Sequence, residues 1–205
     1  MVKVAKSLGH LTWGEEQIAQ YRAAHPPGTA ARLTIELMLN IAARRGDVYQ
    51  LGPQHVQVID GVKKLVWRPS KTKRSTGRLL KVRILPNLQA AIDAMPRSQD
   101  LRAFLVSKYG RPFKSEAVFG NQFADWCHEA GLKKVECDDG KVRSYRAHGL
   151  RKASCVAMLH AGCNSVEIMA VSGHSSLAQL QVYIADYDRE RMADSAMAKL
   201  AGVRP

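Results

Sequence analysis

Four residues near the end of the chain are of types that together can hold an anion and attack it. His148 and Arg151 are three residues apart in the stretch Ala-His-Gly-Leu-Arg-Lys, so a helix would place them on one face. His174 follows a glycine, and Tyr183 lies nine residues further on. Histidine can transfer protons, arginine binds anions in a bidentate manner, and a tyrosine hydroxyl can act as a nucleophile. The segment is therefore a candidate anion-binding and catalytic site.

The charge balance of the chain points to a polyanionic partner. Its 205 residues include 31 Lys and Arg against 18 Asp and Glu, which gives a formal net charge of +13. This balance favours nucleic acid or an anionic membrane surface, and no strongly amphipathic basic helix supports the membrane. No apolar run is long enough to span a membrane, and the start has no signal-peptide core. We therefore expect a cytoplasmic, nucleic-acid-binding protein.

A small antiparallel sheet is predicted between residues 55 and 84, where apolar residues alternate and Asp60-Gly61 marks a two-residue hairpin turn. From Lys63 to Arg83 the sequence has nine basic residues and no acidic one. A solvent-exposed face normally mixes both signs, so this run predicts contacts with a phosphate backbone. The residues assigned to DNA binding are Lys63, Lys64, Arg68, Lys73, Arg74, Arg78, Lys81 and Arg83.

Helices are predicted for most of the remaining chain. Capping residues, helical periodicity and terminating Pro or Gly residues place them at about residues 12–24, 29–43, 86–94, 115–131, 148–161, 164–171, 176–184 and 188–200. The polar stretch 133–146 is predicted to be a loop. The expected fold class is α+β, mainly α: a helical domain with a small three-stranded antiparallel sheet in its N-terminal third.

The end of the second predicted helix carries a charge cluster, Arg44-Arg45-Gly46-Asp47. A solvated helix end and an arginine delivered from a buried helix to a site would both produce this pattern. From the local sequence alone, the solvated end is the favoured interpretation.

The four cysteines do not predict a metal site. They include no CxxC pair, and Cys127-His128 with Cys137 does not have the spacing of a common zinc site. We expect free, mostly buried thiols and no metal.

Together the motifs resemble the signature of the tyrosine recombinases, or phage integrases. His148-Gly-Leu-Arg151, Ser172-Gly-His174 and Tyr183 are similar to the second half of that signature, including its spacing. The stretch from Ala43 to Val48 resembles the first arginine box, which assigns Arg44 to the site despite the local interpretation. Lys71, between the second and third strands, resembles the catalytic lysine. The chain departs from the family at Ala42-Ala43, where Thr-Gly is usual.

The resemblance implies a DNA breaking-rejoining enzyme that uses neither metal nor cofactor. Tyr183 would attack the scissile phosphate to give a 3′-phosphotyrosyl link and a free 5′-hydroxyl. The implied catalytic residues are Arg44, Lys71, His148, Arg151, His174 and Tyr183. Lys73 lies in the same loop as Lys71, so both lysines stay open as the general acid. The sequence also leaves open whether Tyr183 has an active or a resting geometry.

The resemblance also implies partners and a domain division. We expect double-stranded DNA as the partner, a tetramer on DNA, and a monomer or weak self-association without it, in a prokaryotic or phage-infected cell and associated with the nucleoid. Residues 1–11 are expected to be a flexible leader, 12–187 the catalytic domain, and 188–205 a C-terminal helix that docks on a neighbouring subunit. We also expect the N-terminal core-binding domain of the family to be absent from this chain.

Two alternative functions remain open at the level of sequence. One is a non-catalytic DNA-binding integrase fragment. The other is a relaxing activity similar to that of type IB topoisomerases, which shares the chemistry but needs no partner subunit.

Overall fold

The structure of the chain is a computed structural model that describes residues 9–72, 79–96, 102–137, 139–184 and 189–202. The side chains of Thr72 and of residues 182–184, 189–192 and 195 lie outside this description, although their backbone is included. Of the predicted DNA-binding residues, Lys73, Arg74 and Arg78 lie outside the described residues, as do residues 1–8 of the expected leader.

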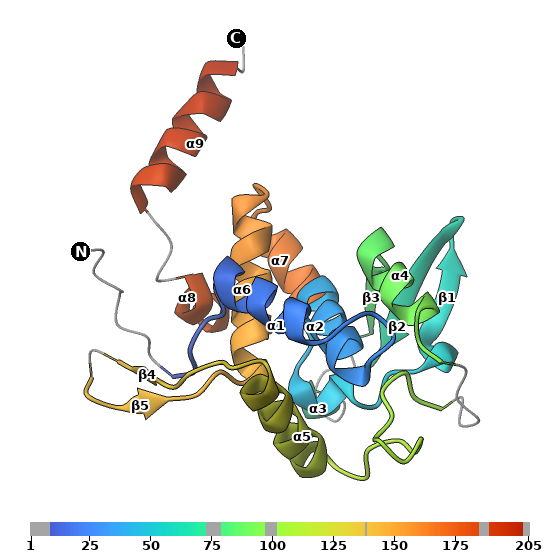
Figure 1. The fold of residues 1–205 in the computed structure, drawn as a ribbon. Helices are drawn as coiled ribbons and strands as arrows, with labels where there is room; N and C mark the ends of the chain where they lie inside the picture. Colours follow the sequence, from blue (N-terminus) through green and yellow to red (C-terminus); the bar gives the residue numbers. More distant parts are fainter. Residues whose placement is uncertain (1–8, 73–78, 97–101, 138, 185–188, 203–205) are drawn as a thin grey trace.

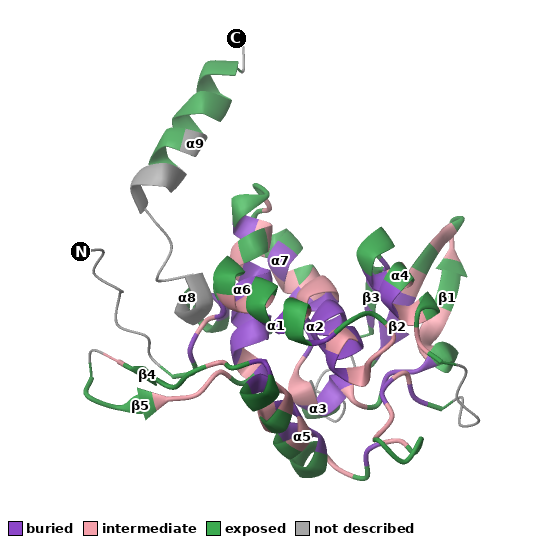
Figure 2. Cartoon of the chain, viewed as in Figure 1, coloured by how far each residue is buried: buried purple, intermediate pink, exposed green. Residues whose placement is uncertain are grey.

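Helix α2 (Ala30–Ile41) runs through the middle of the fold (Figure 1). It begins where predicted, because the Thr29 hydroxyl accepts a hydrogen bond from the backbone N–H of Arg32. Its apolar side chains are buried on almost every side, and the helix is largely purple in Figure 2. Two helices pack against it, α4 (Pro86–Asp93) and α6 (Ala147–His160), so it connects the two halves of the chain.

The predicted sheet is present, with strands β1 (Val56–Ile59), β2 (Val62–Trp67) and β3 (Leu80–Arg83) antiparallel in that order. Asp60 and Gly61 both have positive φ, 53° and 72°, as a type I′ hairpin turn requires. The 3-10 turns η1 (Pro53–His55) and η2 (Ser70–Thr72) lie immediately before β1 and shortly after β2. The second of these turns carries Lys71.

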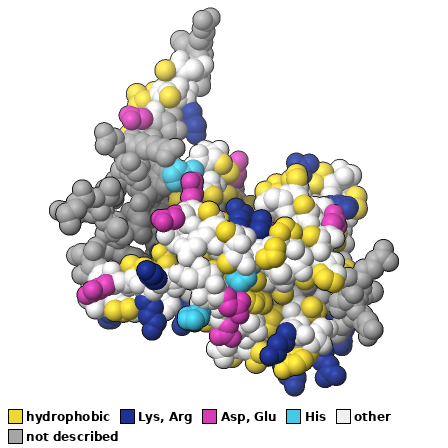
Figure 3. Space-filling view, in the orientation of Figure 1, with side chains coloured by type: hydrophobic (Ala, Val, Ile, Leu, Met, Phe, Trp, Pro, Cys, Tyr) yellow, Lys and Arg dark blue, Asp and Glu magenta, His cyan; other side chains and the backbone are white. Residues whose placement is uncertain are grey.

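Three C-terminal helices complete the site region. Helices α7 (Ser165–Ser172) and α8 (Leu177–Ile184) both pack on α6. Helix α9 (Arg189–Gly202) extends away from the body of the molecule (Figure 1) and carries hydrophobic atoms on its exposed surface (Figure 3). Met197 and Leu200 are both more than 60% exposed there.

The remaining elements differ from the sequence prediction in two places. Helix α1 (Glu15–Ala24) is capped at Gly14 rather than Thr12. Helix α5 (Glu116–Glu129) begins within one residue of its predicted start, with Ser115 as its N-cap, but the expected loop 133–146 contains a short hairpin. Its strands are β4 (Val135–Glu136) and β5 (Val142–Arg143), which are too short to produce a detectable alternation.

No helix among the described residues is both long and apolar enough to cross a membrane. Within the same residues, no three His, Cys, Asp or Glu side chains gather in a way that could hold a metal ion. The four cysteines are free thiols.

Candidate active site

Arg151 is the most deeply buried charged residue of the site, with 1% of its surface exposed. Its Nη1 donates hydrogen bonds to the carbonyl oxygens of Ala42 and, at 2.8 Å, Ser172. Its Nη2 lies 3.0 Å from Nε2 of His174. One guanidinium group therefore joins the end of α2, the end of α7 and the turn that follows α7.

The chain turns sharply at Ala42 to bring Arg44 to the same place. Ala42 has φ 46° and ψ 28°, a left-handed conformation that costs a non-glycine residue roughly 1–2 kcal/mol. This turn ends α2 two residues earlier than predicted and directs the Ala42 carbonyl to Arg151. A separate short helix, α3 (Arg45–Val48), follows with Arg44 as its N-cap. The usual Thr-Gly of the first arginine box is thus replaced here by a strained alanine.

His174 is held by a second left-handed turn, this one at a glycine. Gly173 ends α7 with φ 69°, and a Cβ there would lie 2.8 Å from Cδ1 of Leu80 on β3. The Ser172 hydroxyl donates to the carbonyl of Ile168, so it accepts from Nδ1–H of His174 at 2.7 Å. Nε2 is then the unprotonated nitrogen and accepts from Arg151. Burial, together with the positive charges of Arg151 and Arg44, lowers the pKa of His174 to about 3.

His148 lies one helical turn before Arg151 on α6 and is half-buried. Burial lowers the pKa of His148 to about 4, with further contributions from His10, Arg151, Lys152 and Arg44. The imidazole is therefore neutral at neutral pH and can accept a proton.

Arg44 is the N-cap of α3, two residues after Ala42, and its positive charge contributes to the lowered pKa of both His148 and His174. The structure thus brings four predicted residues together from three parts of the chain: Arg44, His148, Arg151 and His174. Two guanidinium groups beside two neutral imidazoles form an electropositive site that suits a phosphate group.

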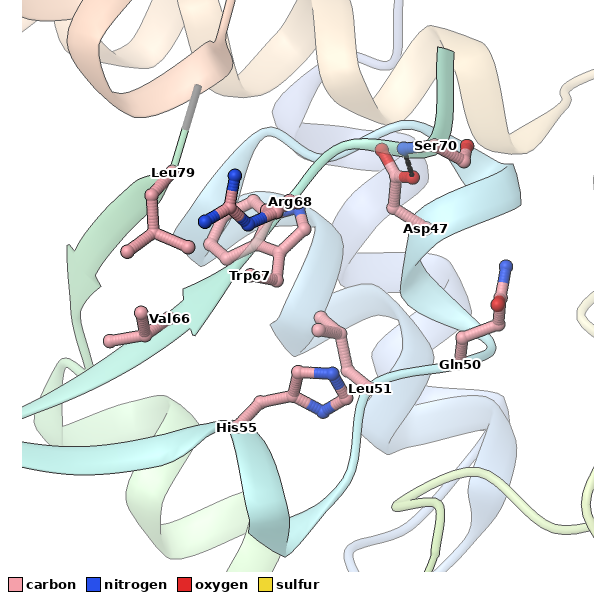
Figure 4. A pocket seen from close by; sticks show the side chains of 9 residues that line it. All are labelled: Asp47, Gln50, Leu51, His55, Val66, Trp67, Arg68, Ser70 and Leu79. Carbon is pink, nitrogen blue, oxygen red and sulfur yellow. Dashed lines mark hydrogen bonds between the residues drawn. The ribbon is translucent and has the colours of Figure 1, made fainter. Parts of the chain in front are cut away.

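Lys71 is connected to Arg44 through Asp47. The Asp47 side chain is buried, and its Oδ1 accepts a hydrogen bond of 2.8 Å from the backbone N–H of Ser70 (Figure 4). Asp47 lies on α3, the helix that Arg44 caps, and Ser70 immediately precedes Lys71. Lys71 itself is exposed.

Asp47 and Ser70 also line a pocket of about 370 Å³ between α3 and the sheet. Figure 4 shows Arg68 in this pocket beside Trp67, with Leu79 and Val66 on the sheet side. Arg68 therefore lies between the end of β2 and the turn that carries Lys71.

The sheet places most of the described basic residues on its outer face. Lys64 is paired with Arg83, and Val66 with Lys81, so these side chains and that of Arg68 lie on one face. Leu65, Trp67, Leu80 and Val82 fill the opposite, buried face. Lys63 lies on the buried face of the sheet, near the start of β2. Its Nζ donates a hydrogen bond of 3.4 Å to Oε1 of Gln89. It does not share the basic face.

Tyr183 lies in α8, which packs on α6. The structure describes its backbone there, and its side chain lies outside the described residues. Its helix is thus adjacent to the one that carries His148 and Arg151.

Sequence reasoning missed three residues at this site. The imidazole of His10 lies against that of His148, with ring centroids 4.8 Å apart. Lys152 is buried to 3% exposure beside it, and Ser172 fixes the tautomer of His174. Lys152 directly follows Arg151, and Ser172 belongs to the motif that contains His174, so both positions carried a signal, whereas nothing in the local sequence marks His10.

Comparison with known proteins identifies the family. The sequence model of the phage integrase family matches residues 14–190, so the chain belongs to that family. Comparison with curated protein sequences gave no significant match.

Solved structures of site-specific recombinases share the fold. XerH bound to a palindromic difH substrate superposes with a TM-score of 0.64 at 14% identity, over 91% of this chain and 52% of XerH. A λ integrase (75–356) dimer bound to a COC′ core site gives 0.64 at 18% identity, over 88% and 61%. A λ integrase tetramer bound to a Holliday junction gives 0.58 at 20%, over 82% and 47%. The chain therefore spans about half to three-fifths of these proteins and has the catalytic fold of the tyrosine recombinases.

Proposed function

We propose that the chain is the catalytic domain of a site-specific recombinase that cleaves and rejoins DNA through a covalent tyrosine intermediate. The observation that carries the proposal is the convergence of Arg44, His148, Arg151 and His174 beside the helix of Tyr183. Membership of the phage integrase family supports it.

The proposed chemistry is a transesterification at phosphorus. The hydroxyl oxygen of Tyr183 attacks the scissile phosphate, the bond from phosphorus to the 5′-oxygen breaks, and a 3′-phosphotyrosyl link forms. Lys71 donates a proton to the departing 5′-oxygen. Because the phosphodiester bond energy is kept in the tyrosine ester, a second 5′-hydroxyl can reverse the step with no external energy source.

Arg44 and Arg151 stabilise the negative charge that develops on the non-bridging oxygens. A donor placed for a transition state in this way contributes typically about 2.7–4 kcal/mol. His148 accepts the proton of the Tyr183 hydroxyl. Its lowered pKa keeps the imidazole neutral but also makes it a weaker base, and the negative charge of a bound phosphate would raise that pKa again.

His174 has to change its partner to contact the phosphate. Its Nε2 accepts a hydrogen bond from Arg151, so it has no proton to donate in this geometry. A phosphate oxygen bound to Arg151 would take the place of Nε2 of His174 as the hydrogen-bond acceptor. Its negative charge would also favour protonation of His174. DNA binding and assembly of the phosphate site are therefore coupled in the proposed mechanism.

The outer face of the sheet supports a DNA partner. Lys64 stands directly opposite Arg83, an arrangement of like charges that destabilises a free sheet. A phosphate backbone would compensate this repulsion, and binding should weaken steeply with salt.

Helix α9 supports the proposed tetramer on DNA. Met197 and Leu200 are exposed on it, and docking on a neighbouring subunit would cover them. The similar λ integrase was solved as a tetramer on a Holliday junction. We expect light scattering to give a monomer or weak self-association without DNA, and a stable tetramer without DNA would contradict this. Action on prokaryotic or phage DNA would place the protein at the nucleoid.

The decisive experiment traps the covalent intermediate. The substrates are nicked duplexes tiled across the ends of the genetic element that encodes the chain. Cleavage releases a short fragment from such a duplex, so the tyrosine adduct is retained. We expect a protein–DNA adduct with the wild type and none with Tyr183→Phe, while Tyr187→Phe, four residues away, keeps the adduct. DNA affinity should be similar in all three.

The outcomes separate the alternative functions. DNA binding without an adduct on any duplex would favour the binding-only fragment, to which the closed Arg151–His174 contact would be suited. Relaxation of supercoiled plasmid by a monomer would favour the topoisomerase-like activity. An adduct that persists in Tyr183→Phe would contradict the proposed nucleophile.

A further inference from the structure

The residues just before α1 form a strap, His10–Trp13, across the first turns of α6. Trp13 is buried and its Nε1 donates to the carbonyl of Arg146, the N-cap of α6, at 3.0 Å. The Nζ of buried Lys152 donates to the carbonyl of His10 at 3.4 Å. Both ends of the strap are therefore attached to the helix that carries the site.

A glycine in the site motif is explained by the strap. A Cβ at Gly149 would collide with the carbonyl oxygen of Leu11, and it would lie 2.8 Å from Cδ1 of Trp13. Gly149 lies between His148 and Arg151, so the strap occupies space that any larger residue would fill. Leu11 belongs to the expected leader but is buried, with 9% exposure. The described end of that leader is thus built into the catalytic fold.

The strap places one imidazole on another. The ring centroids of His10 and His148 are 4.8 Å apart and the ring planes are inclined by 46°. The His10 backbone is fixed by Lys152, so the position of its ring is tied to α6 itself. His10 is exposed, whereas His148 is half-buried beneath it.

We propose that His10 is a positioning residue that holds the His148 imidazole in the orientation for proton transfer with Tyr183. This inference rests on the proposed recombinase function. A general base must lie within hydrogen-bonding reach of its proton, and a ring held on one side has fewer orientations to lose when DNA binds. The strap thereby adds His10 to the segments that form the proposed site.

The charges around the pair keep both rings neutral. Burial lowers the pKa of His10, and Lys152, Arg45, Arg146 and Arg143 act in the same direction. His148 is surrounded by His10, Arg151, Lys152 and Arg44, and its pKa is lowered as well. Two neutral rings can lie in contact without repulsion, so the contact is stable while His148 is the proton acceptor.

The test compares two substitutions of His10. Phe keeps an aromatic ring against His148, whereas Ala removes it. We expect His10→Ala to slow adduct formation roughly tenfold, since a misplaced general base loses part of its contribution, and His10→Phe to stay within about twofold of wild type. Melting temperature and DNA affinity should not change. His128→Ala, a substitution of an exposed histidine on α5, is the matched control and should match wild type.

Two further measurements give the result that a merely structural role would not produce. In a His148→Ala background, His10→Ala should cause no additional loss, because it acts through His148. An NMR titration of the His148 ring should move to higher pH in His10→Ala, and by less in His10→Phe, which still shields the ring from water.

The NMR titration separates this inference from the proposed function. If the wild type forms no adduct, the recombinase proposal fails, and the titration still reports whether His10 covers His148. An unchanged His148 titration in His10→Ala would overturn the inference. So would a His10→Phe rate as low as that of His10→Ala, or a further tenfold loss in the His148→Ala background.

Discussion

The carboxylate of Asp47 accepts a hydrogen bond from the backbone N–H of Ser70, 23 residues away in the sequence. This hydrogen bond joins two motifs that the sequence separates, the arginine box that contains Arg44 and the turn that carries Lys71. Because Asp47 is buried, the bond is poorly replaced by water. Asp47 therefore sets the distance between the two parts of the site that precede α4.

We expect Asp47→Ala to reduce adduct formation about tenfold or more and to cost roughly 1.5–3 kcal/mol of stability, since the hydrogen bond of the Ser70 N–H to a charged, buried carboxylate is lost. Asp47→Asn should be milder, because the amide oxygen can still accept. Single-turnover cleavage and urea unfolding would measure the two effects.

Ser70→Ala is the matched control for Asp47. The donor is the backbone N–H, so removal of the exposed Ser70 hydroxyl should leave both rate and stability near wild type. A loss in Ser70→Ala equal to that in Asp47→Ala would show that the hydroxyl, rather than the backbone, matters.

Arg151→Lys tests whether the guanidinium shape is needed as well as its charge. A lysine cannot reach the Ala42 and Ser172 carbonyls and His174 together, so we expect a loss of roughly 1–3 kcal/mol in unfolding free energy. Adduct formation should fall by about a hundredfold or more, as for loss of a transition-state donor. Equal rates would argue against bidentate phosphate contact.

Arg45→Lys is the control for Arg151→Lys. Arg45 is the second arginine of the first arginine box, next to Arg44. Arg45 pairs with Glu116, but the two side chains are 42% and 51% exposed. An exposed ion pair contributes little, so this substitution should change stability by less than about 0.5 kcal/mol.

The sequence predicted the elements with strong local signals. Thr29 caps its helix as expected, α5 begins within one residue of its predicted start, and Asp60-Gly61 forms the predicted turn. Each of these features depends on a few neighbouring residues, which is why a single sequence contains it. The resemblance to the tyrosine recombinases, and not the local sequence, implied that Arg44 would share a site with Arg151 and His174.

Features that depend on tertiary contacts were missed. The local sequence favoured a solvated helix end at Arg44. This interpretation is wrong for the segment, because α2 ends at the strained Ala42, whose carbonyl is hydrogen-bonded to Arg151, 109 residues away. His10 reaches His148 only through the strap. Lys63 was grouped with the other basic residues, but strand register places it on the core side.

The buried histidines predict that stability falls in acid. The pKa of His174 is about 3 in the folded chain against an ordinary value of 6.5, so the unfolded chain binds a proton that the folded chain does not. Stability is therefore constant above about pH 7 and decreases as pH falls through 6.5 toward 3. For His174 alone the loss between about pH 7 and pH 5 is about 2 kcal/mol. His148 acts in the same direction.

Urea unfolding at the two pH values would measure this loss in the wild type and in His174→Gln. The variant should lose about 2 kcal/mol less on acidification, whatever its stability at neutral pH. His128→Gln, at an exposed histidine, should show the wild-type difference. A wild-type difference in His174→Gln would mean that His174 titrates normally in the folded protein.

The outer face of the sheet predicts opposite effects on DNA binding and on stability. Replacement of Lys64, Lys81 and Arg83 by Gln removes three charges from one face, including the Lys64–Arg83 pair. We expect weaker DNA binding and a decrease of about 0.9 in the slope of log K against log salt for each phosphate that the variant no longer neutralises. The free protein should be as stable as wild type or more stable by a few tenths of a kcal/mol, because the like charges are gone. Fluorescence anisotropy across a salt series and thermal unfolding would measure the two. Lys199→Gln, an exposed charge on α9, should leave the slope unchanged, and an unchanged slope in the triple variant would exclude this face from the DNA interface.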